Sequence, residues 1–516
     1  MRRQDIQLLA LARQGDVTAR CEAGRRYLLG SDGFPQHVAT GIDYLTHPSV
    51  RERPEAARII AESLPLEEIL ALQQEDALRR AAVAGSGSAR LKLGVWLSLK
   101  RSRAAEGQPW LEAAAAEGYA PAQAALAATR EARAADALRA LLDTLKDSGE
   151  LNAAAVALLA ARQALAERAP ELLADSLHIA LALATELSSE LAELVAAAVR
   201  LAEDSGQALR GIAPEQVEAA LELRIARGDR DASYALGRAL SGIDCGALSP
   251  AVLCSGTNMR KGAALLLRAA DAGCDPAWLH LYRLHADHRN SVANPQMARF
   301  FLEKAAARGQ PEAQRKLGAL MLRSAGSPTE SEEAIGWLHQ AAQQDDMHAQ
   351  RLLRSLVLPL DGDGTAAQAA IAQVQLSDPW LAARLKLARD FGLTKLEALC
   401  VDPVEAARPW GLAVGKNPFI TQARLSAPRA VPALTGEALE GLQRTAAFFE
   451  QTRRDANAFE GDLRRRSVRQ RRAFERLGLD EALFFATASS TQLESFRQGS
   501  KWAFRAKQPL EMALAG

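Results

Sequence analysis

A pattern of small and apolar residues recurs in two blocks of the sequence, at intervals of about 33 to 45 residues. Its reference position is an alanine, followed by an apolar residue four positions later and often by glycine five positions later. Before the alanine stand apolar or aromatic residues at −12 and −11, alanines at −8 and −7, and glycine at −4. The reference alanines are Ala19, Ala56, Ala89, Ala122, Ala232, Ala277, Ala313 and Ala349.

This spacing predicts two antiparallel helices in each repeat, because the small and apolar positions fall on one face of each helix. Glycine at +5 lets the partner helix approach closely, and glycine at −4 ends a helix in the left-handed conformation. The segment EKAAARGQPEAQRKLGALM (303–321) carries both positions, at Gly309 and Gly318. We therefore interpret these glycines as architectural and not as a phosphate-binding loop. Stacked repeats bury apolar faces that no single repeat can bury alone.

The pattern resembles the Sel-one-like repeat, a relative of the tetratricopeptide repeat. The matching motifs are ARCEAGRRYLLG (19–30), AQRKLGALM (313–321) and WLHQAAQ (337–343). The resemblance covers about 1–122 and 215–390. It implies an all-α fold, an α/α superhelical solenoid of helix pairs that binds proteins and assembles complexes, commonly in bacterial envelope or signalling systems, and it implies no catalysis. Tyr282 and Arg354 depart from the pattern at the +5 position.

Composition and charge narrow the class of protein further. Lys and Arg number 63 against 62 Asp and Glu, which argues against a chain-wide electrostatic partner such as DNA or an anionic membrane. The most apolar segment, SLHIALALATEL, is too short to span a bilayer, and the N-terminus reads as a helix and not as a signal peptide. The five cysteines (Cys21, Cys245, Cys254, Cys274 and Cys400) are an odd number without an export signal. These features predict a cytoplasmic protein with free thiols and no direct membrane insertion.

We expect five parts in the chain. Repeats occupy 1–122 and 214–399, and the template is lost between them, over 123–213, where about four helices are expected. The proline-containing stretch 400–435 is expected to be an extended surface segment or a linker. The C-terminal helical extension, 436–516, should begin with one long amphipathic helix that reaches Leu463. The loop 241–261 is longer than its equivalents, as either a contact surface or a tolerated insertion.

Arginines are the candidate binding residues. Four follow a reference alanine by one or two positions and are expected to be exposed on the first helix of a repeat, where they would give an anion-favouring groove for a partner: Arg20, Arg90, Arg315 and Arg351. Six more crowd into 464–472 and could bind phosphates of nucleic acid or of a nucleotide, or an acidic protein: Arg464, Arg465, Arg466, Arg469, Arg471 and Arg472. A solvated helix with internal ion pairs is the favoured interpretation of the second group.

Other polar and aromatic clusters carry weaker signals. His280, His285, Asp287 and His288 could hold a metal, but His285 occupies a packing position of the repeat and no third-ligand motif accompanies it. The aromatic residues at −12 could line a ligand groove, but their fixed register favours core packing; they are Tyr44, Trp110, Phe301 and Trp337. DGDGT (361–365) reads as a turn before a helix. We expect no catalytic residue, metal or cofactor.

The sequence thus predicts a non-catalytic scaffold or adaptor that assembles a protein complex through a solenoid surface. Two alternatives stay open. One is an assembly or regulatory factor of a bacterial exopolysaccharide or secretion machine, which only the resemblance suggests and which would make a membrane-associated machine a partner. The other is a nucleic-acid or nucleotide binder that uses 462–472. The sequence leaves open whether the C-terminal segment docks on its own solenoid or reaches a second subunit.

Overall fold

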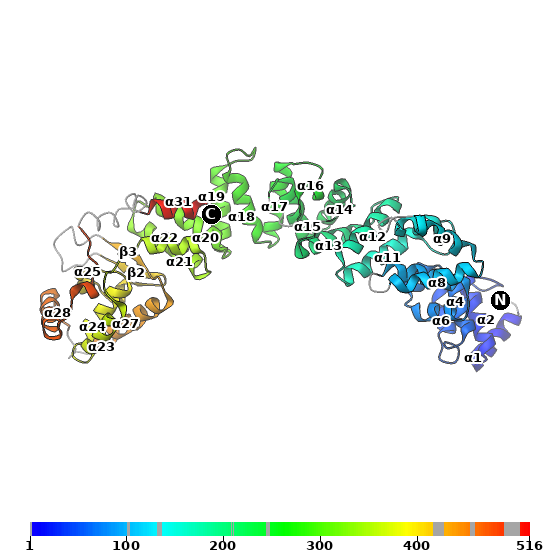
Figure 1. Ribbon diagram of the computed structural model, residues 1–516, viewed down its shortest axis with the longest axis horizontal. Helices are drawn as coiled ribbons and strands as arrows, with labels where there is room; N and C mark the ends of the chain where they lie inside the picture. The colour runs from blue at the N-terminus through cyan, green and yellow to red at the C-terminus, as the bar shows by residue number, and fades with distance from the viewer. Residues whose placement is uncertain are drawn as a thin grey trace. The chain divides into compact units, whose positions relative to one another are not determined.

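The computed structural model describes residues 3–100, 104–131, 137–207, 209, 211–243, 248–415, 428–454, 460–489 and 506–515. The chain forms two compact units, Met1–Gly273 and Cys274–Gly516, and helices make up most of both (Figure 1). The predicted all-α class is therefore confirmed. The boundary between the units falls at the −4 glycine of a repeat, inside the second predicted repeat block. Within the described residues, no helix is both long and apolar enough to cross a membrane.

The first unit is a series of helices joined by short turns. They are α1 (Arg3–Gln14), α2 (Val17–Leu29), α3 (Val38–Leu45), α4 (Pro54–Ser63), α5 (Leu66–Ala71), α6 (Glu75–Val83), α7 (Gly87–Leu99), α8 (Ala104–Ala116), α9 (Ala120–Glu131), α10 (Ala137–Leu145), α11 (Ala153–Ala166), α12 (Pro170–Leu183), α13 (Ser189–Ser205), α14 (Pro214–Ala226), α15 (Arg230–Leu240), α16 (Pro250–Leu253) and α17 (Met259–Asp271).

The second unit continues the helix pairs and adds a small sheet. Its elements are α18 (Pro276–Ala286), α19 (Pro295–Ala307), α20 (Pro311–Ser324), α21 (Pro328–Gln343), α22 (Met347–Ser355), α23 (Gly364–Gln375), α24 (Pro379–Asp390), α25 (Lys395–Cys400), α26 (Pro403–Ala406), β1 (Ala407–Arg408), β2 (Gly411–Val414), β3 (Arg429–Pro432), α27 (Gly436–Arg454), α28 (Leu463–Leu477), the 3-10 turn η3 (Glu481–Leu483) and α31 (Lys507–Ala515).

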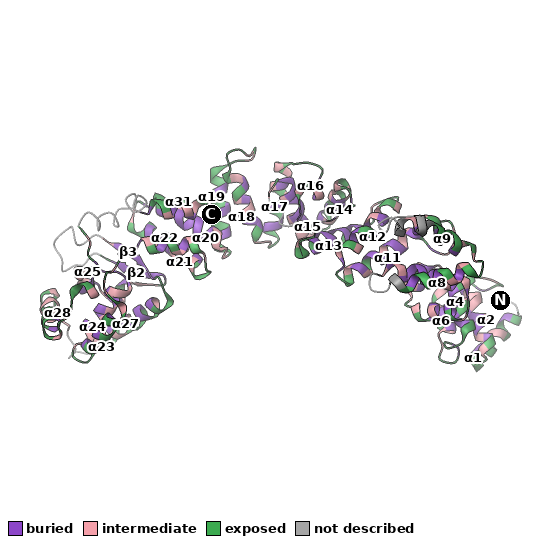
Figure 2. Ribbon diagram, viewed as in Figure 1, coloured by how far each residue is buried: buried purple, intermediate pink, exposed green. Residues whose placement is uncertain are grey.

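The repeat columns correspond to packing contacts. All eight reference alanines are at most 5% exposed, and buried residues follow the sides of the helices that face their neighbours (Figure 2). A Cβ atom added at a +5 glycine would lie 3.0 Å or less from the Cγ of the leucine at −11 of the next repeat. This holds for the pairs Gly24–Leu45, Gly94–Leu111, Gly237–Leu266 and Gly318–Leu338. The +5 glycine therefore provides the space in which the leucine of the partner helix packs.

Replacing Gly318 by alanine is expected to destabilise the second unit by about 1–3 kcal/mol, because overpacked helix contacts cost that much. The added methyl group would lie 2.8 Å from the backbone oxygen of Ala334, which cannot move aside as a flexible side chain can. Gly336→Ala is the matched control on the adjacent helix, since its Cβ would be in ordinary contact, 3.5 Å from Trp410. Calorimetry of the full chain measures both; equal melting temperatures for the Gly318 variant and the wild type would contradict the packing role.

The −4 glycines adopt the predicted left-handed backbone. Gly309 has φ 80°, and Gly15, Gly85, Gly118, Gly228 and Gly273 also have positive φ. Where the repeat that follows α21 lacks this glycine, Asp345 takes the left-handed conformation instead, at φ 63°. Asp is among the few residue types that tolerate it, which explains how that repeat keeps its turn.

The irregular segment 123–213 contains α10, α11, α12 and α13, and Glu150 makes several of its polar contacts with the first repeats. Glu150, in the turn between α10 and α11, accepts hydrogen bonds from the hydroxyls of Ser88 (2.6 Å) and Tyr119, and its Oε2 lies 2.9 Å from Nζ of Lys92. Both donors and the lysine are outside the irregular segment, so this carboxylate links the two parts, as does the backbone N–H of Asn152, which donates to Oε2 of Glu67 at 2.9 Å.

The expectation of a surface segment or linker at 400–435 is wrong for the residues that the structure describes there, 400–415 and 428–435. They include α26 and a three-stranded antiparallel sheet of order β1-β2-β3, and every residue of β2 and β3 is buried. Arg429 of β3 pairs with Glu397 of α25 at 2.9 Å inside this core. Short strands that are buried on both faces show no alternation of polar and apolar residues, which is why the pattern gave no strand signal.

The expected single helix to Leu463 is also wrong. Helix α27 ends at Arg454, and α28 begins a new helix at Leu463. Asp462 caps α28 by accepting a hydrogen bond from the backbone N–H of Arg465 at 2.9 Å, and Gly461 before it has φ 92°. A carboxylate in this position satisfies one of the free donors at a helix start and so favours a break there.

Candidate functional site

The C-terminal helix α31 packs against α20 and α22 of the same unit (Figure 1). Its buried residues, Leu510 and Ala513, are 3% and 0% exposed, and Ala506 directly before the helix is 0% exposed; the three follow the i, i+4, i+7 spacing of one helix face. Lys507 and Glu511 on the opposite face are exposed. The chain thus places an amphipathic helix in a groove of its own repeats, hereafter the α20–α22 groove.

The buried face of α31 belongs to one apolar cluster with residues of α20, α21, α22 and the chain after them. Those residues include Ala319, Leu322, Ile335, Leu338, Leu352, Leu353, Leu356 and Leu358. Burying a leucine side chain of the size of Leu510 contributes about 1.5–3 kcal/mol. This apolar contact supplies the main attraction that holds α31, and the polar contacts set its position.

Arg315 of α20 fixes the C-terminal end of α31. Its side chain is 3% exposed; Nη1 donates to the carbonyl oxygen of Ala513, and Nε lies 2.9 Å from Oδ2 of Asp346. The other oxygen of Asp346 caps α22 by accepting from the N–H of Ala349 at 2.8 Å. A guanidinium next to the last carbonyls of a helix is favourable, because those carbonyls have no partner within the helix and carry partial negative charge.

The predicted row of exposed arginines is therefore wrong in part. Arg315 is buried beneath α31 and neutralised by Asp346; its position two residues after the reference alanine would be exposed only if nothing covered α20. Arg90 is paired with Glu117 and 16% exposed, and Arg20 is half-buried. Arg351 is exposed, and its Nη1 lies 3.6 Å from Sδ of Met512 in α31. Of the four predicted arginines, the two in the second unit, Arg315 and Arg351, both contact α31. Arg20 and Arg90 belong to the first unit.

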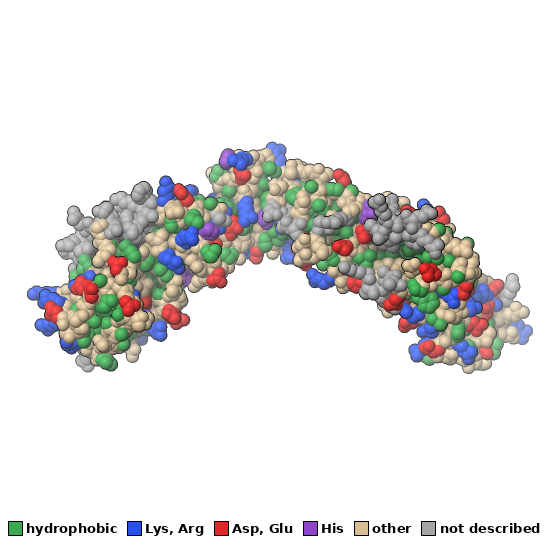
Figure 3. Space-filling model, in the orientation of Figure 1, with side chains coloured by type: hydrophobic (Ala, Val, Ile, Leu, Met, Phe, Trp, Pro, Cys, Tyr) green, Lys and Arg blue, Asp and Glu red, His purple; other side chains and the backbone are tan. Residues whose placement is uncertain are grey.

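The arginine cluster of α28 divides into two groups. Arg466 donates to the carbonyl of Leu399 at 3.0 Å and pairs with Glu460 at 3.1 Å. Arg469 donates to the carbonyl of Glu460 at 2.6 Å and lies over the ring of Trp380. The remaining four are exposed, and basic side chains gather over α28 in Figure 3: Arg464, Arg465, Arg471 and Arg472. The cluster is therefore partly structural, and the interpretation as a binding site concerns only its outer residues.

The candidate histidines do not converge. The ring of His285 packs against Phe301, with centroids 5.1 Å apart, and burial lowers its pKa, while His288 is exposed. Across the described residues, no group of three or more His, Cys, Asp or Glu side chains could hold a metal ion. Burial raises the pKa of the Cys400 thiol to about 11, so that it stays protonated at neutral pH.

Three further expectations have structural outcomes. Asp363 of DGDGT caps α23 through the N–H groups of Thr365 and Ala366, which confirms the turn before a helix. Of the aromatic −12 residues, Phe301 is buried, but Tyr44, Trp110 and Trp337 are only half-buried. The insertion 241–261 forms α16, which packs on α14 and α15; Cys245 lies outside the described residues.

The sequence interpretation missed the residues that complete the groove. Asp346 stands directly before a helix, where the preference for Asp at the N-cap could have selected it. The segment PLEMALA (509–515) has apolar residues at helical spacing, so an amphipathic helix could have been predicted. No local signal pairs it with α20, because the two segments are separated by almost two hundred residues.

No family model and no curated protein sequence matches the chain. Among solved structures, the chain is similar to a protective antigen of uropathogenic Escherichia coli that displays an SLR fold, at 16% identity, covering 98% of this chain and 97% of that chain with a TM-score of 0.30. It is also similar to a Sel1 repeat protein from Oxalobacter formigenes, at 20% identity, covering 68% and 89% with a TM-score of 0.26. The assignment of helix pairs rests on the packing described above.

Proposed function

We propose that the protein is a non-catalytic scaffold that binds a helical segment of a protein partner in the α20–α22 groove. The observation that carries the proposal is α31, a helix of the same chain that already fills this groove. The groove recognises general features of a helix: an apolar stripe and the carbonyls of the last turn. A partner helix with these features would compete with α31 for the same contacts.

The partner helix has a definable pattern. Small residues correspond to Ala506 and Ala513, which are fully buried, and a leucine corresponds to Leu510. The helix should end near Arg315, since the guanidinium contacts a carbonyl two residues before the end of α31. Because α31 occupies the groove in cis, the apparent affinity for a partner is reduced by the fraction of molecules in which the groove is closed.

The test uses the full chain with the substitution Leu510→Asp, which should release α31, and a labelled peptide with the sequence of 506–515. The variant is expected to bind the peptide at least about tenfold more tightly than the wild type, because competition in cis is removed. Gln508→Asp is the matched control, since it adds the same charge at an exposed position of the same helix. Equal peptide binding by the two variants would show that the groove does not act as a helix-binding site.

The other predicted functions have less support in the described residues. Two of the six arginines in the nucleic-acid alternative are engaged inside the second unit. The alternative of an exopolysaccharide or secretion machine concerns the identity of the partner, and a helix-binding groove is compatible with it. Protein binding is the common element of both scaffold interpretations, and it is the function that the groove favours.

A further inference from the structure

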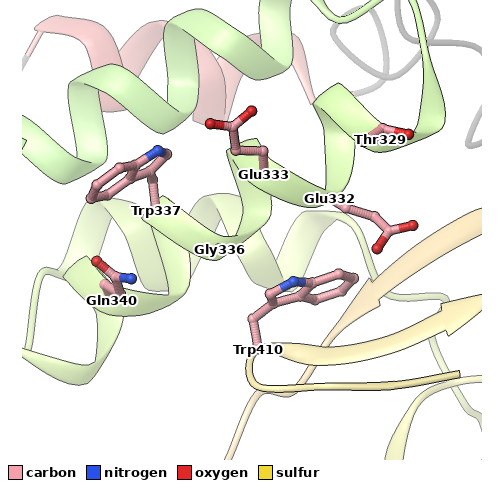
Figure 4. Close-up of a pocket in the computed structure, with 7 residues that line it drawn as sticks. All are labelled: Thr329, Glu332, Glu333, Gly336, Trp337, Gln340 and Trp410. Atoms are coloured by element: carbon pink, nitrogen blue, oxygen red, sulfur yellow. The ribbon is translucent and has the colours of Figure 1, made fainter. Parts of the chain in front are cut away.

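A hollow of about 490 Å³ lies on α21, between that helix and the turn that joins β1 to β2. Six lining residues share one stripe of α21 at spacings of three and four, and the seventh is Trp410 of the turn. The stripe consists of Thr329, Glu332, Glu333, Gly336, Trp337 and Gln340. Figure 4 shows the two indoles projecting from different elements, with Gly336 between their attachment points and both glutamates along the helix. We call this the Trp337–Trp410 hollow.

The fold holds Trp410 firmly and leaves Trp337 accessible. Trp410 is 8% exposed, and its carbonyl accepts a hydrogen bond from Ala433 at 3.0 Å, which fixes the turn. Its Cδ1 lies 3.5 Å from the point where a Cβ of Gly336 would be, so the indole edge reaches the backbone of α21. Trp337 is half-buried although it occupies the −12 position of the repeat, which the sequence assigns to the core. A large aromatic side chain therefore lines an open space.

The charges around the hollow favour a cation. None of its seven lining residues, all of which are described, is basic, and two are carboxylates. Glu332 is partly neutralised by Arg408, whose Nε lies 3.0 Å from Oε2 and whose Nη1 is held by the carbonyl of Glu405. Glu333 is exposed and makes no ion pair with any described residue. Trp is the side chain whose ring face attracts cations most strongly.

We propose that the Trp337–Trp410 hollow binds a cationic side chain, an arginine or lysine, of a protein partner. The accessible indole of Trp337 would contact the cation and its aliphatic stem, the largely buried Trp410 would form one wall of the hollow, and Glu333 would supply the opposite charge. The lining stripe runs along the helix from Thr329 to Gln340, roughly 16 Å at 1.5 Å per residue, which is longer than a small ammonium ion needs and suits a side chain with its flanking peptide. The proposal is independent of the α20–α22 groove, because the hollow shares no lining residue with it.

The test titrates the full chain, labelled with ¹⁵N at its tryptophan indoles, with a short capped peptide that contains one arginine. Signals of Trp337 and Trp410, assigned from the variants Trp337→Phe and Trp410→Phe, are expected to shift. The same peptide with citrulline in place of arginine keeps the shape and removes the charge, and it should bind about tenfold more weakly, in line with the loss of a desolvated cation–π contact.

Two variants separate recognition from folding. Glu333→Gln alters an exposed side chain and should weaken binding of the arginine peptide several-fold, with a smaller dependence on salt. Glu440→Gln, an equally exposed change on α27, should leave it unchanged. The proposal is overturned if citrulline and arginine peptides bind equally, if the shifts fall on other indoles, or if the arginine peptide shifts none of them at millimolar concentration.

Discussion

Replacing Glu150 by alanine is expected to destabilise the first unit by about 3 kcal/mol, the lower end of the range for breaking a buried ion pair. Glu150 is the carboxylate on which Ser88, Tyr119 and Lys92 converge. The side chain of Lys92 is 2% exposed, so its ammonium group would stay buried without its counter-charge. The variant also removes the acceptor of two hydroxyl groups, whose desolvation is no longer compensated.

The expected loss of stability in Glu150→Ala is at the lower end of the range for a buried ion pair, because Lys92 keeps two other acceptors. Its Nζ also donates to the carbonyls of Ala61 (2.6 Å) and Leu64 (2.9 Å), at the end of α4. The variant Lys92→Met keeps the aliphatic stem and removes the charge. It is also expected to destabilise the first unit, because the carbonyls of Ala61 and Leu64 lose their donor. In the double variant with Glu150→Gln, no charge of the pair remains. The two changes should therefore cost less together than the sum of each alone, by about 0.5–3 kcal/mol.

Hydrogen exchange in the full chain localises the effect. Faster exchange is expected in 66–72 and 149–156, because the backbone N–H of Leu66 donates to the carbonyl of Glu150 at 3.0 Å. Glu117→Ala is the control, since Glu117 is a half-exposed partner of Arg90 and such pairs contribute at most about 1 kcal/mol. Unchanged exchange over 149–156 in the Glu150 variant would show that the side chain of Glu150 does not hold the irregular segment.

The contrast between the repeat columns and Glu150 shows what the sequence can specify. Gly318 and Leu338 occupy fixed positions in a pattern that recurs, so their contact could be predicted from periodicity. Glu150 occurs once, in a turn, and its side-chain partners Ser88 and Tyr119 lie dozens of residues away in the chain. A contact that depends on tertiary position and not on local spacing leaves no periodic signal.

The candidate site shows the same limit in another form. Arg315 and Arg351 both follow a reference alanine by two positions, and both contact α31. Their roles differ because α31 covers one of them and only borders the other, and that difference is decided by residues at the far end of the chain. The sequence therefore selects Arg315 and Arg351 by their register in the repeat, whereas the helix that both contact comes only from the structure.

Arg315→Glu is expected to release α31 and to destabilise the second unit by about 3–5 kcal/mol, the cost of breaking a buried ion pair. The new carboxylate would face both Asp346 and the carbonyl of Ala513, so two favourable contacts become repulsive. Arg351→Glu, in α22, should change the free energy of unfolding by less than about 1 kcal/mol. Arg351 is exposed, and its contact is with the sulfur of Met512.

Hydrogen exchange over 506–515 distinguishes the two variants. Protection should be lost with Arg315→Glu and kept with Arg351→Glu. Asp346→Asn should give an intermediate loss of protection over 506–515. The variant removes the negative charge that pairs with Arg315, but its amide oxygen can still cap α22. If Arg315→Glu left 506–515 fully protected, the apolar face of α31 alone would hold the helix. A partner helix would then need no group that pairs with Arg315. The proposal that the partner helix ends near Arg315 would be contradicted.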